Sequence, residues 1–224
     1  MSLKSPRDAA KKRAFDLIVG TPLLIISLPV QLIVAGLVRL SSKGPVLHRA
    51  TRVGRGGNEF IMLKFRTMRI DMPGTLVTAS GDPRITRIGR HLRTSKLDEL
   101  PQLFQVVRGT MSLVGRRPED PRHVSHYTTE QSQVFRVPPA LTGPAVLVDE
   151  EKTLFGNSHE EVESRYISEF VPKKVQINLN YLENWTLRVD IVILVQTAFA
   201  LIPLFRLRAL SLAEKGALET NEEW

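Results

Sequence analysis

Cysteine is absent from the 224-residue sequence. Disulfide bonds, zinc–thiolate sites and thiol nucleophiles are therefore excluded, whereas a reducing compartment is permitted. Aromatic residues form only 6% of the chain and do not alternate with the basic residues, as they do where single-stranded nucleic acid stacks on a protein. Acidic residues are outnumbered by Lys and Arg, 23 to 31, which leaves a net charge of +8. This charge indicates anionic partners, namely phosphates, nucleic acid or acidic lipids.

Histidine is also scarce, with five in the chain. Only His123 and His126 form a close pair, and no carboxylate-rich helix motif surrounds them. The pattern therefore favours a solvated helix face over a metal site. Without thiols or a histidine cluster, carboxylate oxygens remain as metal ligands, and they suit Mg²⁺.

Charge is missing from residues 17–38, which read LIVGTPLLIISLPVQLIVAGLV. As a helix this run would be about 33 Å long, which is enough to cross the hydrocarbon core of a bilayer. It is too long for the apolar region of a signal peptide, and no small-x-small cleavage site follows it. The run is therefore a candidate membrane helix.

The flanks of this run do not favour one orientation across a membrane. Five basic residues lie before it and five lie within about 20 residues after it. Pro29 near its middle predicts a sharp bend, and Ser27 could satisfy a backbone group that the bend frees. We therefore expect a re-entrant helix with both ends on the same face, although the length alone would also fit an ordinary span.

The spacing of apolar and turn residues predicts an α+β fold that is mainly helical. Two extended runs flank Gly54, Gly56 and Gly57, which predicts a small β-hairpin, since these glycines lack the spacing of a P-loop or a dinucleotide fingerprint. A loop is expected at residues 70–83. Helices are expected at residues 6–38, 84–94, from about 98, up to about 134, 158–170 and 172–184. The apolar run 191–205 is expected to lie in a membrane interface.

Asp98 and Glu99 are the only acids between Pro83 and Pro118, a span with eight Lys and Arg. One interpretation is structural: acids are favoured at a helix start, and Ser95 with Asp98 loosely fits a capping box. The other is chemical. A helix start and nearby Arg bind phosphate, one carboxylate attacks phosphorus to form an acyl phosphate, and its neighbour holds Mg²⁺ with the substrate phosphates.

Two basic motifs likewise allow both a structural and a phosphate-binding interpretation. KFRTM ends the second strand of the predicted hairpin, and its Lys64 either guards a sheet edge or binds phosphate. SLVGRRPED places Arg116 and Arg117 either in a solvated turn or in a rigid loop that presents a guanidinium fork to a diphosphate.

Several motifs along the chain resemble those of the bacterial sugar transferase family. In chain order they are KRAFD (12–16), RVGRGGNEF with KFRTM (52–68), LDELPQL (97–103), MSLVGRRP (111–118), LTG (141–143) and YLENWTLRVD (181–190). More closely, the chain resembles the small monotopic phosphoglycosyl transferases, from about residue 11 to about 200. This family moves a sugar phosphate from a UDP-sugar to a polyprenol phosphate and releases UMP.

The resemblance implies a role for each matching residue. Asp98 is implied as the nucleophile that forms a covalent phosphosugar intermediate, and Glu99 as the ligand of Mg²⁺. Lys64, Arg93 and Arg117 occupy motif positions that contact the substrate phosphates or the nucleotide. The implied partners are a UDP-sugar, polyprenol phosphate and membrane lipids, with no nucleic acid, and the oligomeric state is left open.

The resemblance also implies a location and a division of the chain. Residues 1–40 would form a basic segment and a re-entrant membrane helix, 41–210 a compact catalytic domain surrounded by amphipathic interfacial helices, and 211–224 a polar tail. The protein would lie on the cytoplasmic face of the bacterial inner membrane and catalyse the first membrane step of glycoconjugate or exopolysaccharide synthesis.

The chain departs from the family pattern at three positions that bear on nucleotide and sugar contacts. Arg116 replaces a usual Pro, Ala140 a usual Gly and Val146 a usual Gln, so the identity of the donor sugar stays open.

Two other classes of function also stay open. A non-catalytic peripheral membrane protein would bind anionic lipid and release no UMP. A nucleic-acid binder would show steep salt dependence, but the uncharged run argues against it.

Overall fold

The computed structural model describes residues 5–70, 82–147 and 164–201 of the chain. In chain order its helices and strands are α1 (Pro6–Ser41), β1 (Leu47–Val53), the 3-10 helix η1 (Arg55–Gly57), β2 (Glu59–Phe65), α2 (Arg87–Thr94), the 3-10 helix η2 (Leu97–Glu99), α3 (Gln102–Arg108), β3 (Ser112–Val114), α4 (Pro121–Val124), the 3-10 helix η3 (Gln131–Arg136), β4 (Ala140–Thr142), α5 (Pro144–Leu147), the π-helical turn η5 (Tyr166–Phe170), α7 (Val171–Glu183) and α8 (Leu187–Leu201). The fold is mainly helical with small sheets, which confirms the predicted class at that level.

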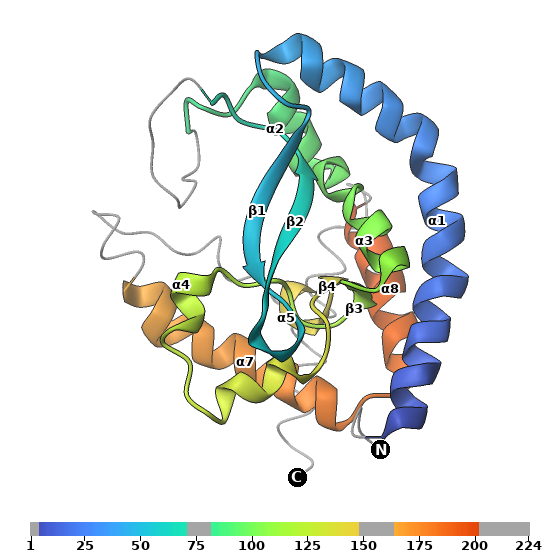
Figure 1. The fold of residues 1–224 in the computed structure, drawn as a ribbon, viewed down its shortest axis with the longest axis vertical. Coiled ribbons are helices and arrows are strands. Elements are labelled where there is room, and N and C mark those ends of the chain that lie inside the picture. The colour runs from blue at the N-terminus through green and yellow to red at the C-terminus, as the bar shows by residue number, and fades with distance from the viewer. Residues whose placement is uncertain (1–4, 71–81, 148–163, 202–224) are drawn as a thin grey trace.

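The predicted hairpin is confirmed, and it stands beside the long curve of α1 (Figure 1). β1 pairs antiparallel with β2, from Leu47 opposite Phe65 to Val53 opposite Glu59. Gly56 and Gly57 in the connection have φ values of 71° and 81°. Residues with a side chain rarely adopt this left-handed region, so the turn needs these glycines.

α3 is fixed against the free edge of β2 by one side chain. The amide of Gln105 accepts a hydrogen bond from the Leu63 backbone N–H at 2.9 Å and donates to the Ile61 carbonyl at 2.8 Å. It therefore occupies the position of a further strand along this edge. Lys64 follows Leu63 on β2. The contact of Gln105 with β2 therefore places Lys64 next to the turn that precedes α3.

The N-terminal helix predicted at residues 6–38 is confirmed, whereas a re-entrant bend at Pro29 is not. α1 is one helix of 36 residues that contains both Pro22 and Pro29, and Figure 1 shows a curve without a reversal. Ser27 donates to the Leu24 carbonyl at 2.9 Å, whereas Pro29 leaves the carbonyl four residues earlier, that of Ile25, without its helical donor. Ser27 therefore does not satisfy the group for which it was proposed.

Both halves of α1 pack on the same body, which explains why the helix continues through its prolines. In the first half, a Cβ on Gly20 would lie 3.2 Å from a methyl group of Val106 on α3. In the second half, Val34 and Val38 are buried in a cluster with Phe65 and Leu92. Between them, α1 exposes large apolar side chains: Leu23, Ile25, Ile26, Leu28, Val30, Leu32 and Ile33.

A buried polar network joins the start of α1 to α7 and α8. Lys12 Nζ lies 2.7 Å from the carboxylate of Asp190, which is completely buried. The same carboxylate accepts hydrogen bonds from Tyr181 at 2.6 Å and from Trp185 Nε1 at 3.1 Å. Asp16, one turn further along α1, accepts two hydrogen bonds from β3. The motif YLENWTLRVD thus serves to anchor α1.

Several other predicted elements differ from the structure. The polar helix expected up to residue 134 is divided into α4 and η3, because Thr128 and Gln131 form reciprocal side chain–backbone hydrogen bonds that begin a new helical segment. Residues 140–147, for which no helix or strand was predicted, contain β4 and α5. Pro172 begins a helix, α7, as predicted. The tail 211–224, most of the loop 70–83 and the start of the helix expected at 158–170 lie outside the described residues.

Candidate active site

Asp98 and Glu99 lie in η2, the turn between α2 and α3, and not inside the α-helix that was expected to begin there. Lys96, the residue before η2, has a φ of 57°, a left-handed conformation that is uncommon outside glycine. This conformation turns the chain sharply at the end of α2. The two carboxylates therefore stand on a tight loop.

The capping interpretation of Asp98 is wrong. Ser95 donates to the His91 and Leu92 carbonyls at the end of α2 and forms no capping box. Asp98 is 6% exposed, and its Oδ1 atom has no hydrogen-bond partner among the described residues. Because a buried carboxylate oxygen without a partner is unfavourable, its presence indicates a functional role.

The two carboxylates have different electrostatic environments. Burial first, and then the charge of Glu99, raise the pKa of Asp98 to about 6, against the lowering effect of Lys64, Lys96 and Arg93. Burial also raises the pKa of Glu99, but Arg117 and Lys96 outweigh this effect, so the pKa is lowered overall. Both groups are therefore mainly ionised at pH 7.

Cationic side chains from three elements surround the pair. Arg117, in the loop after β3, lies with Nη2 2.8 Å from Glu99 Oε1. Lys64, from β2, has its pKa lowered by burial, although the charge of Asp98 opposes this effect. Arg93, from α2, donates to Thr67 Oγ1 at 2.9 Å. The structure therefore brings all three predicted substrate-binding residues near the acids.

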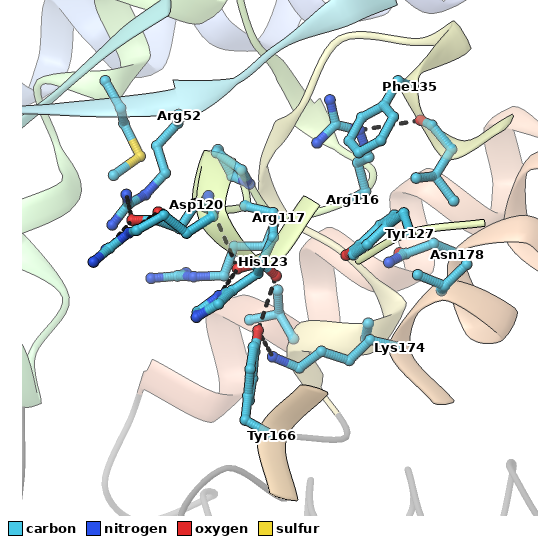
Figure 2. Close-up of a pocket in the computed structure, with 18 of the residues that line it drawn as sticks. Arg52, Arg116, Arg117, Asp120, His123, Tyr127, Phe135, Tyr166, Lys174 and Asn178 are labelled. Atoms are coloured by element: carbon cyan, nitrogen blue, oxygen red, sulfur yellow. Dashed lines mark hydrogen bonds and ion pairs between the residues drawn. The ribbon is translucent and has the colours of Figure 1, made fainter. Parts of the chain in front are cut away.

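A cavity of about 260 Å³ opens beside this cluster (Figure 2). Its lining includes Lys64 and Arg117 but not Arg93, whose guanidinium is held by Thr67. Asp98 and Glu99 are outside the lining and adjoin the cavity through these two cations. Most charged groups in the lining are basic: Arg52, Lys64, Lys96, Arg116, Arg117, Arg122 and Lys174. The cavity therefore suits an anionic ligand.

The donor set fits a magnesium ion that is completed by its substrate. Mg²⁺ is usually held by one or two carboxylates together with water and substrate phosphates. Asp98 offers an oxygen without a partner, and Glu99 is beside it. No group of three or more His, Asp and Glu that could hold a metal occurs in the described part of the chain. A metal here would therefore depend on phosphate oxygens for further ligands.

Comparison with known proteins decides the family. The sequence matches the bacterial sugar transferase family over residues 7–203. The chain belongs to this family. This confirms the family that the sequence motifs indicated.

Related proteins have names that specify their reactions. The UDP-glucose:undecaprenyl-phosphate glucose-1-phosphate transferase of Caulobacter vibrioides is 37% identical over 204 residues, 88% of this chain and 72% of the relative. A Xanthomonas campestris protein of the same name is 42% identical over 176 residues, 76% and 34% of the two chains. The UDP-N-acetylgalactosamine-undecaprenyl-phosphate N-acetylgalactosaminephosphotransferase of Aeromonas hydrophila is 32% identical over 200 residues, 87% and 44%. The chain thus spans less than half of the last two.

Arg116, which departs from the family pattern, does not form half of a phosphate fork. It is 3% exposed, and it donates to the Gly54 carbonyl at 2.9 Å and to the Val134 carbonyl at 3.1 Å. Its guanidinium carbon lies 4.5 Å from the centre of the Phe135 ring. Arg116 therefore joins the hairpin turn to η3, and neither of its sequence-based alternatives is correct. Arg117 alone faces the acids.

The other two departures are also placed by the structure. Val146 lines the cavity. Ala140 is 1% exposed on β4, and its N–H donates to the Arg116 carbonyl at 2.7 Å. Two of the three departures, Arg116 and Val146, thus belong to the lining of one cavity. Because they are 30 residues apart in the sequence, only the folded structure shows that they share it.

A partly buried group around Glu119 on the cavity wall was missed by the sequence analysis. Glu119 accepts a hydrogen bond from the Tyr166 hydroxyl at 2.8 Å and lies 3.0 Å from His123 Nδ1. Lys174 Nζ is 3.3 Å from the same hydroxyl. His123 therefore does not belong to a purely solvated face. Because Tyr166 and Lys174 are more than 40 residues away, only the fold shows that they surround Glu119.

Arg66 in the motif KFRTM has a structural role that the sequence analysis also missed. Its guanidinium donates to the carbonyls of Pro45 and Ser42, the latter at 2.7 Å, and lies 3.4 Å from the Val38 carbonyl. It therefore binds the C-terminal end of α1, where helix carbonyls lack internal partners. The nearby Lys64 remains available to the cavity.

Proposed function

We propose that this protein transfers a sugar 1-phosphate from a UDP-sugar to a polyprenol phosphate and releases UMP. The observation that carries this proposal is Asp98, a buried carboxylate with an unpartnered oxygen beside a cationic cavity. The names of the relatives support the same reaction class. Their sugars differ, so the identity of the donor sugar stays outside the proposal.

Asp98 acts as the nucleophile in this proposal. One of its carboxylate oxygens attacks the phosphorus that carries the sugar, and the bond from that phosphorus to UMP breaks with the electron pair leaving on UMP. An oxygen of polyprenol phosphate then attacks the same phosphorus and displaces the carboxylate. Covalent catalysis of this kind divides a difficult transfer into two easier ones. The raised pKa makes Asp98 more basic than an ordinary Asp while leaving it mainly ionised at pH 7.

The neighbouring residues control the charge. Lys64, Lys96 and Arg117 offset the negative charge of a diphosphate and of the departing UMP. Arg117 also neutralises Glu99 at 2.8 Å. Mg²⁺, held by Glu99 with help from the diphosphate oxygens, would supply further neutralisation of the phosphates.

We infer in addition that the protein is monotopic, on the cytoplasmic face of a bacterial inner membrane. α1 is long and apolar enough to cross a bilayer, but both of its halves pack on the same body, through Gly20 and through Val38. A helix that crossed the membrane would carry one of these packed halves away from that body. The exposed apolar side chains of α1, together with those of α8, therefore suit insertion from one side.

The test is a screen of UDP-sugars for UMP release by the purified protein with polyprenol phosphate. Asp98→Asn should reduce turnover to background, because an amide is a poor nucleophile. Glu183→Gln, at an exposed acid on α7, serves as the matched acid-to-amide control. Incubation of the wild type with the correct donor alone should add the mass of one phosphosugar at Asp98. Absence of UMP release from every donor would instead favour a non-catalytic lipid-binding protein.

A further inference from the structure

Asn178 is a buried amide in the lining of the cavity. It lies on α7, one turn after Lys174 and Val175, and all three line the cavity. The residue is only 8% exposed, and its Oδ1 atom has no hydrogen-bond partner among the described residues. Leaving such a group buried and unpaired is unfavourable, so a ligand that supplies the missing partner would be stabilised there.

Part of the cavity wall is apolar and aromatic. Figure 2 shows Tyr127 beside Asn178, in a part of the cavity separate from Asp120 and Arg52. The rings of Tyr127 and Phe135 are stacked, with centroids 5.6 Å apart. The remaining apolar side chains in the lining are Met62, Pro118, Val134, Ala145, Val146 and Val175. Such a wall suits a flat ring with few polar atoms, whereas each hydroxyl group of a hexose would need its own partner.

The amide of Asn178 matches the edge of a uracil base. It carries one acceptor and two donors in a plane, and the edge of uracil carries an N–H next to a carbonyl. Asn residues bind base edges through paired hydrogen bonds of this kind, and bases in protein sites also stack on aromatic rings. The terminal torsion of an Asn side chain is broad, so a small rotation turns the oxygen toward the cavity.

We propose that Asn178 recognises the uracil base of the donor, accepting from its N3–H and donating to the adjacent carbonyl. The proposal rests on the proposed function, because the donor is a UDP-sugar. Lys64, Lys96 and Arg117 line the same cavity as Asn178, so the diphosphate and the base of one donor would share it. The cavity of about 260 Å³ is smaller than those of about 300–1,000 Å³ that enclose whole ligands, which suits one half of the donor.

An acetamido group on the sugar offers the same carbonyl and N–H, so the test must separate it from uracil. The names of the relatives favour uracil. UDP is common to their donors, whereas glucose has no acetamido group. A recognition group for uracil would serve every such donor, and one for an acetamido group would serve only some.

The experiment compares the binding of UMP and N3-methyl-UMP to the full-length protein in detergent, by calorimetry with Mg²⁺ present. The methyl group removes the N–H donor and adds bulk at the same position, so the contact is assigned by the loss of discrimination in the Asn178 variant and not by the wild-type difference alone. The wild type should bind UMP about tenfold or more tightly than the methylated nucleotide, within the range of discrimination by a paired base contact. Asn178→Ala should bind UMP as weakly as the methylated nucleotide and lose the discrimination. Gln176→Ala, at an exposed position on the same helix, should retain it.

The outcomes separate this proposal from the proposed function. If the wild type binds UMP but does not discriminate against the methylated nucleotide, the Asn178 proposal is overturned while the transferase proposal stands. If Asn178→Ala weakens binding only of a UDP-N-acetylhexosamine and not of UMP, the amide recognises the sugar, and the uracil assignment is wrong. In steady-state assays, Asn178→Ala should raise the KM for the UDP-sugar with little change in kcat, because the base contact exists before and during the reaction.

Discussion

Replacement of the nucleophile should stabilise the protein while it abolishes activity. The pKa of Asp98 is about 6 in the folded protein, compared with an ordinary value of 3.8. Between these values the folded protein binds a proton that the unfolded chain does not hold. The contribution of this protonation to stability is therefore fully present below about pH 4 and is lost as the pH rises through about 6. At pH 7 the ionised group costs up to about 3 kcal/mol, which Asp98→Asn removes.

Thermal unfolding of the wild type and Asp98→Asn in the same detergent checks this reasoning. For a chain of this length each kcal/mol changes Tm by about 2–4 °C, so the variant should have a Tm higher by up to about 6–12 °C at pH 7. The difference should shrink as the pH is lowered toward 4, where Asp98 is protonated in the folded wild type and no ionised carboxylate remains buried.

Asp120→Asn provides a control of opposite sign. Hydrogen bonds from Arg122 hold the pKa of Asp120 well below its usual range, and the charge of Arg52 adds to the effect. The Arg52 and Arg122 guanidinium groups lie 2.7 and 2.8 Å from its carboxylate. Asp120→Asn should therefore lower Tm at pH 7. The reasoning about Asp98 is refuted if its Asn variant is no more stable than the wild type at pH 7, or if the difference in Tm stays constant down to pH 4.

Four further expectations concern the reaction and the anchoring of α1. UMP release should vanish in EDTA and return with Mg²⁺, and Glu99→Gln should raise the Mg²⁺ concentration needed for activity; full activity in EDTA contradicts this. The rate should fall as the pH is lowered through about 6, because protonated Asp98 cannot attack. Lys12→Met should cost about 3–5 kcal/mol by leaving Asp190 buried without its cation, whereas the exposed Lys11→Met should be nearly neutral. Single cysteines at residues 5 and 43 should both escape a membrane-impermeant thiol reagent until the cells are opened, and labelling of only one would establish a span.

Local sequence patterns predicted the elements whose causes are local. The glycines of the hairpin turn at Gly56 and Gly57 require a left-handed backbone, and alternating residues on either side form the strands. The adjacency of Asp98 and Glu99 in a basic segment likewise made them candidates without any structure. The same reasoning failed where a local preference competes with packing. Pro29 was expected to bend the N-terminal helix sharply, but α1 is one continuous helix whose two halves are held on one body.

The hairpin, the apolar helix, the acidic pair and the family motifs could be predicted from the amino-acid sequence, because each depends on residues close together in the chain. The partners of the buried polar groups could be found only in the folded protein. Lys12 meets Asp190 across 178 residues, Arg116 binds carbonyls 62 and 18 residues away, and Asn178 joins a cavity whose other walls come from earlier elements. A buried polar side chain carries no local sign of its partner, because that partner is fixed only when the whole chain packs and excludes water.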